Sequence, residues 1–83
     1  MVILKESAGK IVITDLPEDS VSRKAGIKAG DTLISLDGIP MKTSDDLRIE
    51  LFYRKHGDMV TVKVVRKRFL LGDKEMEFVV KLP

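Results

Sequence analysis

The sequence predicts an α+β domain that is mainly β: a small, partly open barrel or sandwich of five to six strands, capped by one short and one longer helix. Three observations lead to this fold class. Alternating or β-branched runs recur between turn signals, one later segment has the caps and charges of a helix, and 83 residues suffice for only one compact core. Residues 1–83 are therefore expected to form a single domain, and the abrupt apolar start at Met1 favours a fragment of a larger protein.

The first two strands are expected at Val2–Lys5 and Lys10–Asp15, because both are short runs of apolar or β-branched residues. The pair Ala8-Gly9 between them is a turn signal. Pro17 ends the second strand, because it cannot donate to a sheet and it keeps the preceding residue out of helical geometry. These residues predict two strands joined by a tight turn.

A short helix is expected next, over Val21–Ala25. Asp19 or Ser20 can cap its first turn through a side-chain oxygen. Gly26 can adopt the left-handed conformation that ends a helix, and Gly30-Asp31 then turns the chain into the next strand.

The run Thr32–Leu36 alternates as a strand, with Leu33 and Ser35 expected on one face and its other three residues on the opposite face. Asp37-Gly38 closes this strand with a strong turn signal. Ile39–Met41 can form only a brief edge strand, because its central proline cannot donate to a neighbouring strand.

One substantial helix is expected to begin after a cap at Thr43 or Ser44 and to run to about Tyr53. Its ends carry charges that match the helix macrodipole, namely Asp45, Asp46, Arg54 and Lys55. Its core-facing residues are expected to be Leu47 and Leu51, flanked by either Ile49 or Phe52.

Two further strands complete the expected fold. The turn signal His56-Gly57-Asp58 leads into the alternating run Met59–Arg66. After a loop over Lys67–Asp73, the run Met76–Leu82 is expected to pair with it as a hairpin.

Composition excludes several classes of function. The net charge is only +2, from 15 Lys and Arg against 13 Asp and Glu, so no strong field is available to attract nucleic acid. The absence of cysteine excludes disulfides, thiolate metal sites and a cysteine nucleophile. No apolar run approaches the roughly 20 residues of a membrane span.

Four segments together resemble the signature of PDZ domains. Ile11–Ser20 matches the strand, proline turn and helix start of that family, and Ala25–Gly38 matches its A-G-[LI]-x-x-G-D-x-[IL] segment and the Asn-Gly or Asp-Gly turn that follows. Ser44–Arg48 and Gly57–Val62 continue the match. The strand at Glu75–Leu82 is similar to that of the circularly permuted bacterial type, which is attached to HtrA/Deg serine proteases, C-terminal processing proteases and site-2 proteases.

The resemblance implies a peptide-binding module without catalytic activity of its own. In PDZ domains a peptide or protein C-terminus adds as an antiparallel strand beside a groove strand, here Val2–Glu6, and its side chains enter pockets shared with the long helix. No cofactor is implied. The other implied partner is the rest of the parent protein, which the resemblance suggests is a bacterial protease of the periplasm or cell envelope.

The groove residues implied by the resemblance come from the first strand and the long helix. They are Val2, Ile3, Leu4, Lys5, Ser44, Arg48, Leu51 and Phe52. Alternation allows only one of Ile3 and Leu4 to face the pocket. The alternative for Leu51 and Phe52 is packing in the core, and for Arg48 it is a solvated charge on the helix face. An Arg48 that points into the groove would favour an acidic ligand side chain or the terminal carboxylate.

One departure from the family leaves two functions open. PDZ domains bind a peptide carboxylate with a glycine-rich loop just before the groove strand, and this sequence begins where that loop should end. Either the loop lies upstream of Met1, or the domain recognises something other than a free C-terminus. The alternative function is a structural or interaction domain of a non-protease envelope or secretion assembly, with its groove unused.

Catalysis and metal binding have little support in the residues. The sole histidine, His56, stands in a turn signal, where a surface side chain is expected, and with Asp58 it offers the only candidate for a Ser-His-Asp site. A metal site would need carboxylates, and Asp45 and Asp46 are already explained as charges at a helix start.

A basic run next to apolar residues stands between the last two strands, at Arg66, Lys67, Arg68, Phe69 and Leu70. It could make a weak contact with an anionic membrane surface, or it could dock against the rest of the parent protein. The third interpretation is that Phe69 and Leu71 fold back onto the core while the charges stay solvated.

Overall fold

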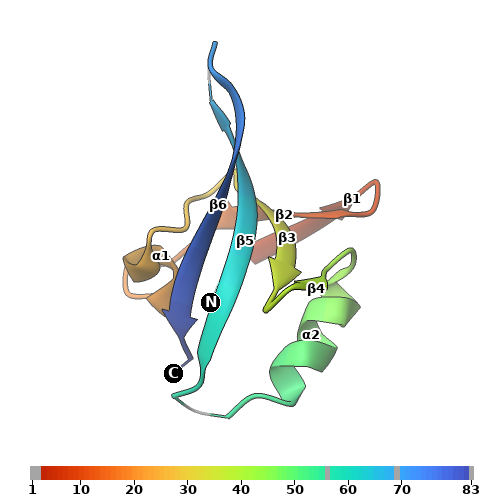
Figure 1. Cartoon of the computed structure of the whole chain (residues 1–83), viewed down its shortest axis with the longest axis vertical. Helices are drawn as coiled ribbons and strands as arrows, with labels where there is room; N and C mark the ends of the chain where they lie inside the picture. Colours follow the sequence, from red (N-terminus) through yellow and green to blue (C-terminus); the bar gives the residue numbers. More distant parts are fainter. Residues whose placement is uncertain (1–2, 56, 69, 83) are drawn as a thin grey trace.

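The computed structural model describes residues 3–55, 57–68 and 70–82, and it confirms a mainly β fold with two helices (Figure 1). The elements in chain order are β1 (Ile3–Ser7), β2 (Lys10–Asp15), α1 (Val21–Ala25), β3 (Thr32–Leu36), β4 (Ile39–Pro40), α2 (Ser44–Phe52), β5 (Met59–Arg68) and β6 (Gly72–Lys81). Element order and type agree with the prediction throughout. The largest differences in length concern β5 and β6.

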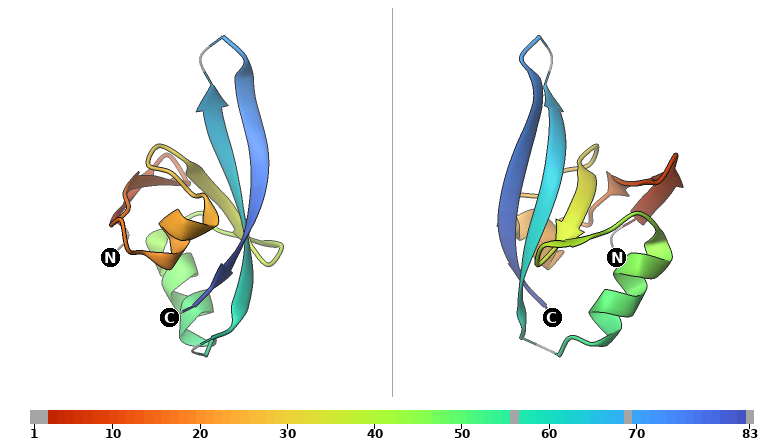
Figure 2. Two further views of the ribbon diagram at one scale, coloured as in Figure 1. Left: turned by 90° about the vertical axis from the view of Figure 1, so that its left-hand side faces the viewer. Right: turned by 45° about the vertical axis from the view of Figure 1, so that its right-hand side comes forward.

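The strands form one antiparallel sheet that does not close into a barrel. Its order is β1-β2-β3-β5-β6, and the short β4 pairs with β3 beside this path. Figure 1 shows α1 beside β6 and α2 on the other side of β5, and the right-hand view of Figure 2 shows α2 near β1. Strands β1 and β6 are therefore the two edges of the path.

The core is apolar, and alternate residues of β2 and β5 supply nearly half of it. Ile11 and Ile13 are buried on β2, and Val60, Val62 and Val64 are buried on β5. The other buried apolar residues are Leu16, Ile27, Leu33, Leu36, Met41 and Val80. This period of two is the pattern of strands that cover a core with one face.

In β3 the predicted alternation is wrong at Leu36. The sequence places Leu36 opposite to Leu33, yet both side chains are buried. The pairing with β5 shifts between Leu33 and Ser35, so that Leu33 lies opposite Val64 and Leu36 lies opposite Val62. One extra residue in β3 therefore returns Leu36 to the core face, as a β-bulge does.

Both helices begin at side-chain caps. The Ser20 side chain accepts from the Arg23 N–H at 3.2 Å and caps α1, and Gly26 ends α1 with φ 116°. Thr43 caps α2 in a capping box with Asp46, in which each side chain accepts from the other residue's backbone N–H. Of the two candidates predicted for each cap, the structure uses Ser20 and Thr43.

Helix α2 rests lightly on the sheet. None of its residues is buried, and Leu47 alone packs partly against the core cluster. Phe52 is 83% exposed and Ile49 is 56% exposed, so neither provides the predicted apolar flank, and core packing of Phe52 is wrong. Polar contacts at the helix ends position α2, as described below, and they leave its apolar side chains largely outside the core.

The β5–β6 hairpin is longer than predicted and projects beyond the rest of the domain (Figure 1). Lys67 pairs with Asp73 and Arg68 pairs with Gly72, so the expected loop is mostly strand. Leu70 and Leu71 are exposed near the tip, and the expectation that Leu71 folds back onto the core is therefore wrong. Phe69, to which the same expectation applied, lies outside the described residues.

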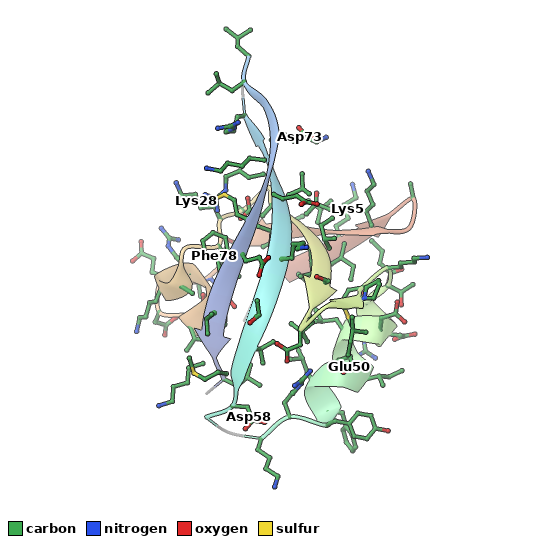
Figure 3. All side chains as sticks on the ribbon, in the orientation of Figure 1. Lys5, Lys28, Glu50, Asp58, Asp73 and Phe78 are labelled. Atoms are coloured by element: carbon green, nitrogen blue, oxygen red, sulfur yellow. The ribbon has the colours of Figure 1, made fainter. Side chains whose placement is uncertain are left out.

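Arg66 does not belong to a solvated basic run, because it forms a partly buried ion pair with the buried Asp31. Its Nε and Nη2 atoms each donate to a different Asp31 carboxylate oxygen at 2.8 Å, and Nη2 also donates to the Gly26 carbonyl at 2.9 Å. The guanidinium lies 5.6 Å from the ring centroid of Phe78. Phe78 belongs to β6, which lies beside α1 (Figure 3). This pair ties the α1–β3 loop to β5.

The Asp31 side chain is only 2% exposed, and it is nevertheless held in the charged form. Burial disfavours the carboxylate, but the hydrogen bonds from Arg66 and from the Lys28 backbone N–H, together with the positive charges of both residues, outweigh it. The pKa of Asp31 therefore lies below its usual value. The same pairing raises the pKa of Arg66: the hydrogen bond to Asp31 outweighs the loss of solvation.

Candidate functional site

An apolar cavity of about 240 Å³ lies beneath α2, bounded by both ends of the sheet path. Its lining residues are Leu4, Ile13, Ser22, Ile27, Leu33, Leu36, Leu47, Leu51, Val60, Val62, Val80 and Leu82. Eleven of these twelve side chains are aliphatic, and Ser22 is the exception. The surface is suited to hydrocarbon side chains and offers little to a charged ligand group.

The β1 strand borders this cavity with an unpaired edge. In the described sheet β1 pairs only with β2, from Ile3 opposite Asp15 to Ser7 opposite Lys10. Its other edge is turned toward α2, which contacts β1. An edge strand carries main-chain N–H and C=O groups that can pair with an added strand.

Polar contacts fix both ends of α2 relative to the sheet. At the start, the Ser44 backbone N–H donates to Oε1 of Glu6 on β1. Past the end of the helix, Arg54 forms an ion pair of 2.8 Å with Asp37 in the β3–β4 turn. Asp37 is held in turn by the Thr61 N–H, which donates to its Oδ1 at 2.8 Å. The helix is thus positioned over the cavity without burying its own side chains.

The structure brings together two of the predicted groove residues at the cavity, Leu4 and Leu51. Ser44 lies at the adjacent helix start, and Lys5 is exposed on β1, where Figure 3 labels it. Ile3 begins β1, and Val2 lies outside the described residues.

Arg48 and Phe52 lie away from the cavity lining. Arg48 is 78% exposed and forms an ion pair of 3.6 Å with Asp45, which is the solvated position that the sequence left open. Phe52 makes an edge-to-face contact with Tyr53 at 5.8 Å between ring centroids.

Sequence reasoning missed several cavity residues and the contact of Glu6. Leu47 was assigned to the core face of the helix, and its spacing of four from Leu51 already put both on one side. Ile27 and Leu82 carried no such signal, because loop and terminal residues reach the cavity only through the tertiary fold. Nothing in the pattern around Glu6 connects it to Ser44, which lies 38 positions later.

A larger hollow of about 360 Å³ lies beside α1, but it is a weaker candidate. Its lining includes Asp15, Arg23 and Lys28. The Arg23 guanidinium already donates to the Leu16 carbonyl at 3.2 Å. Its lining residues come from the end of β2, from α1 and from the loops beside them, and none comes from β1 or β6.

Residues considered for catalysis and metal binding have structural partners where the structure describes them. Asp46 serves the α2 cap, and Oδ2 of Asp58 accepts from the Lys55 N–H at 2.8 Å within its turn. His56 lies outside the described residues. Across residues 3–55, 57–68 and 70–82 no group of three or more His, Asp or Glu side chains is placed to hold a metal ion. Nor is any helix in these ranges long and apolar enough to cross a membrane.

Comparison with known proteins identifies relatives among proteases of different chemistry. A "Probable periplasmic serine endoprotease DegP-like" of Rickettsia conorii is 33% identical over 79 residues, which are 95% of this chain and 14% of that protein. The "Serine protease Do-like HtrB" of Bacillus subtilis is 34% identical over 59 residues, covering 69% and 13%. A "Putative zinc metalloprotease R01501" of Rhizobium meliloti is 38% identical over 56 residues, covering 68% and 15%.

The chain therefore spans about one seventh of the length of these relatives, and the shared region accompanies both serine and zinc enzymes. The family model of the PDZ domain matches residues 2–82. With the open six-stranded sheet and its two helices, this match shows that the chain belongs to the PDZ domain family, in the form associated with HtrA-like proteases.

Proposed function

We propose that this domain captures an extended peptide or protein C-terminus, which adds to β1 as an antiparallel strand beneath α2. The observation that carries the proposal is the free edge of β1 next to the apolar cavity. Main-chain hydrogen bonds to β1 supply affinity for any extended segment, and the cavity supplies choice among side chains. Such short-strand docking has a Kd on the order of micromolar, or about 8 kcal/mol.

The cavity favours a ligand with an aliphatic side chain at its end. Leu4 and Leu51 stand at the side where a ligand strand would lie, and Leu33, Leu36 and Val62 line the interior. Burial of an aliphatic side chain there removes apolar surface from water, whereas a charged side chain would lose hydration without a partner.

In its parent protein we propose a regulatory or substrate-recognition role, outside the cytoplasm, next to a separate catalytic domain. The relatives named as serine and zinc proteases share this region although their catalytic chemistry differs. A region common to both supports a role in recognition rather than in cleavage. The chain itself is then not an enzyme, and its partners are the captured peptide and the remainder of the parent.

An NMR titration with C-terminal peptides and matching amidated controls tests this function. Capture of a C-terminus should shift the amide resonances of β1 and α2, and amidation should abolish the shifts. Shifts that ignore amidation would indicate recognition of internal segments. If no peptide in a diverse library shifts β1 or α2, the groove is unused, and the alternative of a structural domain in a non-protease assembly holds.

Substitutions of Leu51 and Ile49 test whether the ligand binds at the cavity or on the outer face of α2. Leu51→Asp should weaken peptide binding at least about tenfold, because it places a carboxylate at the apolar cavity. Ile49→Asp, with the same change on the outer face of α2, should leave affinity within about twofold. Fluorescence polarisation with one peptide compares the two variants, and equal losses would contradict the proposed position of the ligand.

A further inference from the structure

The bond from the Ser44 N–H to Glu6 crosses the opening through which a ligand strand would pass. Glu6 belongs to β1 and Ser44 is the first residue of α2, so the bond joins the two walls of the groove. A carboxylate that accepts from a backbone N–H at a helix start also benefits from the helix macrodipole. The groove is therefore closed at this end by a charge-assisted contact.

The pairing of β1 places Glu6 on the same face as Leu4. Leu4 lies opposite Ile13 and Glu6 lies opposite Ile11, and both partners are core residues of β2. Side chains two apart in a strand share a face, so Glu6 follows Leu4 along the groove by one step. If a ligand's last residue lies beside Leu4, the residue two positions earlier lies beside Glu6.

A strand seated between β1 and α2 must separate Glu6 from the Ser44 N–H. Glu6 is exposed, so water can replace the lost donor, and the negative charge of the carboxylate then determines which ligand side chain is favoured beside it. The neighbouring acids are already engaged: Asp46 accepts from the Thr43 N–H, and Asp45 pairs with Arg48. Glu6 is thus the acid at this opening whose charge a ligand side chain can meet once the strand is seated.

We propose that Glu6 is a specificity-determining residue of the groove, which favours a ligand with a cationic or hydrogen-bond-donating side chain beside it and excludes an acidic one. This inference rests on the proposed function, because it concerns the chemistry of the peptide that β1 accepts. The aliphatic cavity alone cannot produce a preference for a cationic over an acidic side chain.

Three C-terminal peptides test the preference, identical except for Lys, Gln or Glu at the third residue from the end. Wild-type protein should bind the Lys peptide about threefold to tenfold more tightly than the Glu peptide, as expected for attraction and repulsion at an exposed carboxylate. Glu6→Gln retains an oxygen that can accept from the Ser44 N–H but removes the charge, so the Lys-to-Glu ratio should fall toward one. The Ser44 amide resonance should move when peptide binds wild-type protein, because its carboxylate partner leaves.

Asp45→Asn is the matched control, since it removes a negative charge from the same helix start without touching the Glu6 contact. It should keep the wild-type preference. A ratio near one in wild-type protein, a ratio unchanged in Glu6→Gln, or an equal loss in Asp45→Asn overturns the inference while peptide binding itself persists. Absence of any binding overturns the proposed function, and the inference with it.

Discussion

Replacement of Arg66 by methionine should lower the free energy of unfolding by about 3–5 kcal/mol. The substitution keeps an apolar side chain of similar length but leaves the Asp31 carboxylate, only 2% exposed, with the Lys28 backbone N–H as its hydrogen-bond donor. An unpaired buried charge is among the costliest defects in a small domain, whose whole stability is about 4–12 kcal/mol at this length. Urea unfolding followed by circular dichroism measures the loss.

The pH dependence of this loss identifies its cause. In the wild type the pKa of Asp31 lies below the unfolded value of about 3.9, so its contribution is complete above that pH and is lost as the pH falls through the folded-state pKa. Without Arg66, burial raises the pKa of Asp31 above the unfolded value, and the charged form then destabilises the fold as the pH rises. The difference between the two proteins should be largest near pH 7 and shrink below about pH 4.

Two companion variants keep the test decisive if Arg66→Met fails to fold. Arg66→Lys retains the charge without the two-pronged bond and should lose less stability than the methionine variant. The double variant Asp31→Asn/Arg66→Met buries no charge and should recover part of the loss. A loss below about 1 kcal/mol for Arg66→Met, as for an exposed ion pair, would contradict this account.

Gly26→Ala should cost about 2–4 kcal/mol of stability through two separate effects. The backbone at Gly26 has φ 116°, a conformation in which a side chain is strained. In addition, a Cβ at this position would lie 2.8 Å from Cε1 of Phe78, the ring beneath Arg66. Relief of that contact would displace Phe78 or the Gly26 carbonyl, to which Arg66 donates.

Gly30→Ala is the control that isolates the contact with Phe78. Gly30 also has a positive φ, of 95°, but a Cβ there meets no atom within 4 Å. Its cost should therefore be the backbone strain alone, about 1–2 kcal/mol. Thermal unfolding of both variants gives the comparison. Equal losses at the two positions would show that the Phe78 ring yields freely and that no packing constraint exists at Gly26.

Much of this fold follows from local chemistry that the sequence displays. Several features depend only on neighbouring residues. They are the caps at Ser20 and Thr43, the turns at Ala8-Gly9 and Asp37-Gly38, and the alternation of β5. Features that depend on residues far apart in the sequence could not be predicted from local patterns. Leu36 is buried only because β3 shifts its pairing with β5, and the hairpin continues past Arg66 only because each strand supplies the other's partners.

The candidate site was predictable to the same extent. The position of Leu4 and Leu51 at the cavity could be expected, because a family pattern and a helical spacing point to them, and their contact with a ligand stays a prediction. The exposure of Phe52 could not, because an apolar residue at a helix end has no local mark that distinguishes core from solvent. The sequence places Arg66 in a basic run, whereas the fold pairs it with Asp31, which lies 35 positions earlier in the chain. The membrane contact suggested for the hairpin tip stays a prediction.

Polar contacts at its two ends hold α2 over the aliphatic groove, so ionic strength should affect how firmly the helix is held there. The ion pair of Arg54 with Asp37 is partly exposed, so dissolved salt screens it, whereas added salt does not screen the apolar contacts of the cavity beneath the helix. The two walls of the groove would then separate more easily in concentrated salt. The aliphatic part of the binding surface would then respond to the ionic composition of its surroundings through the contacts that hold α2 in place.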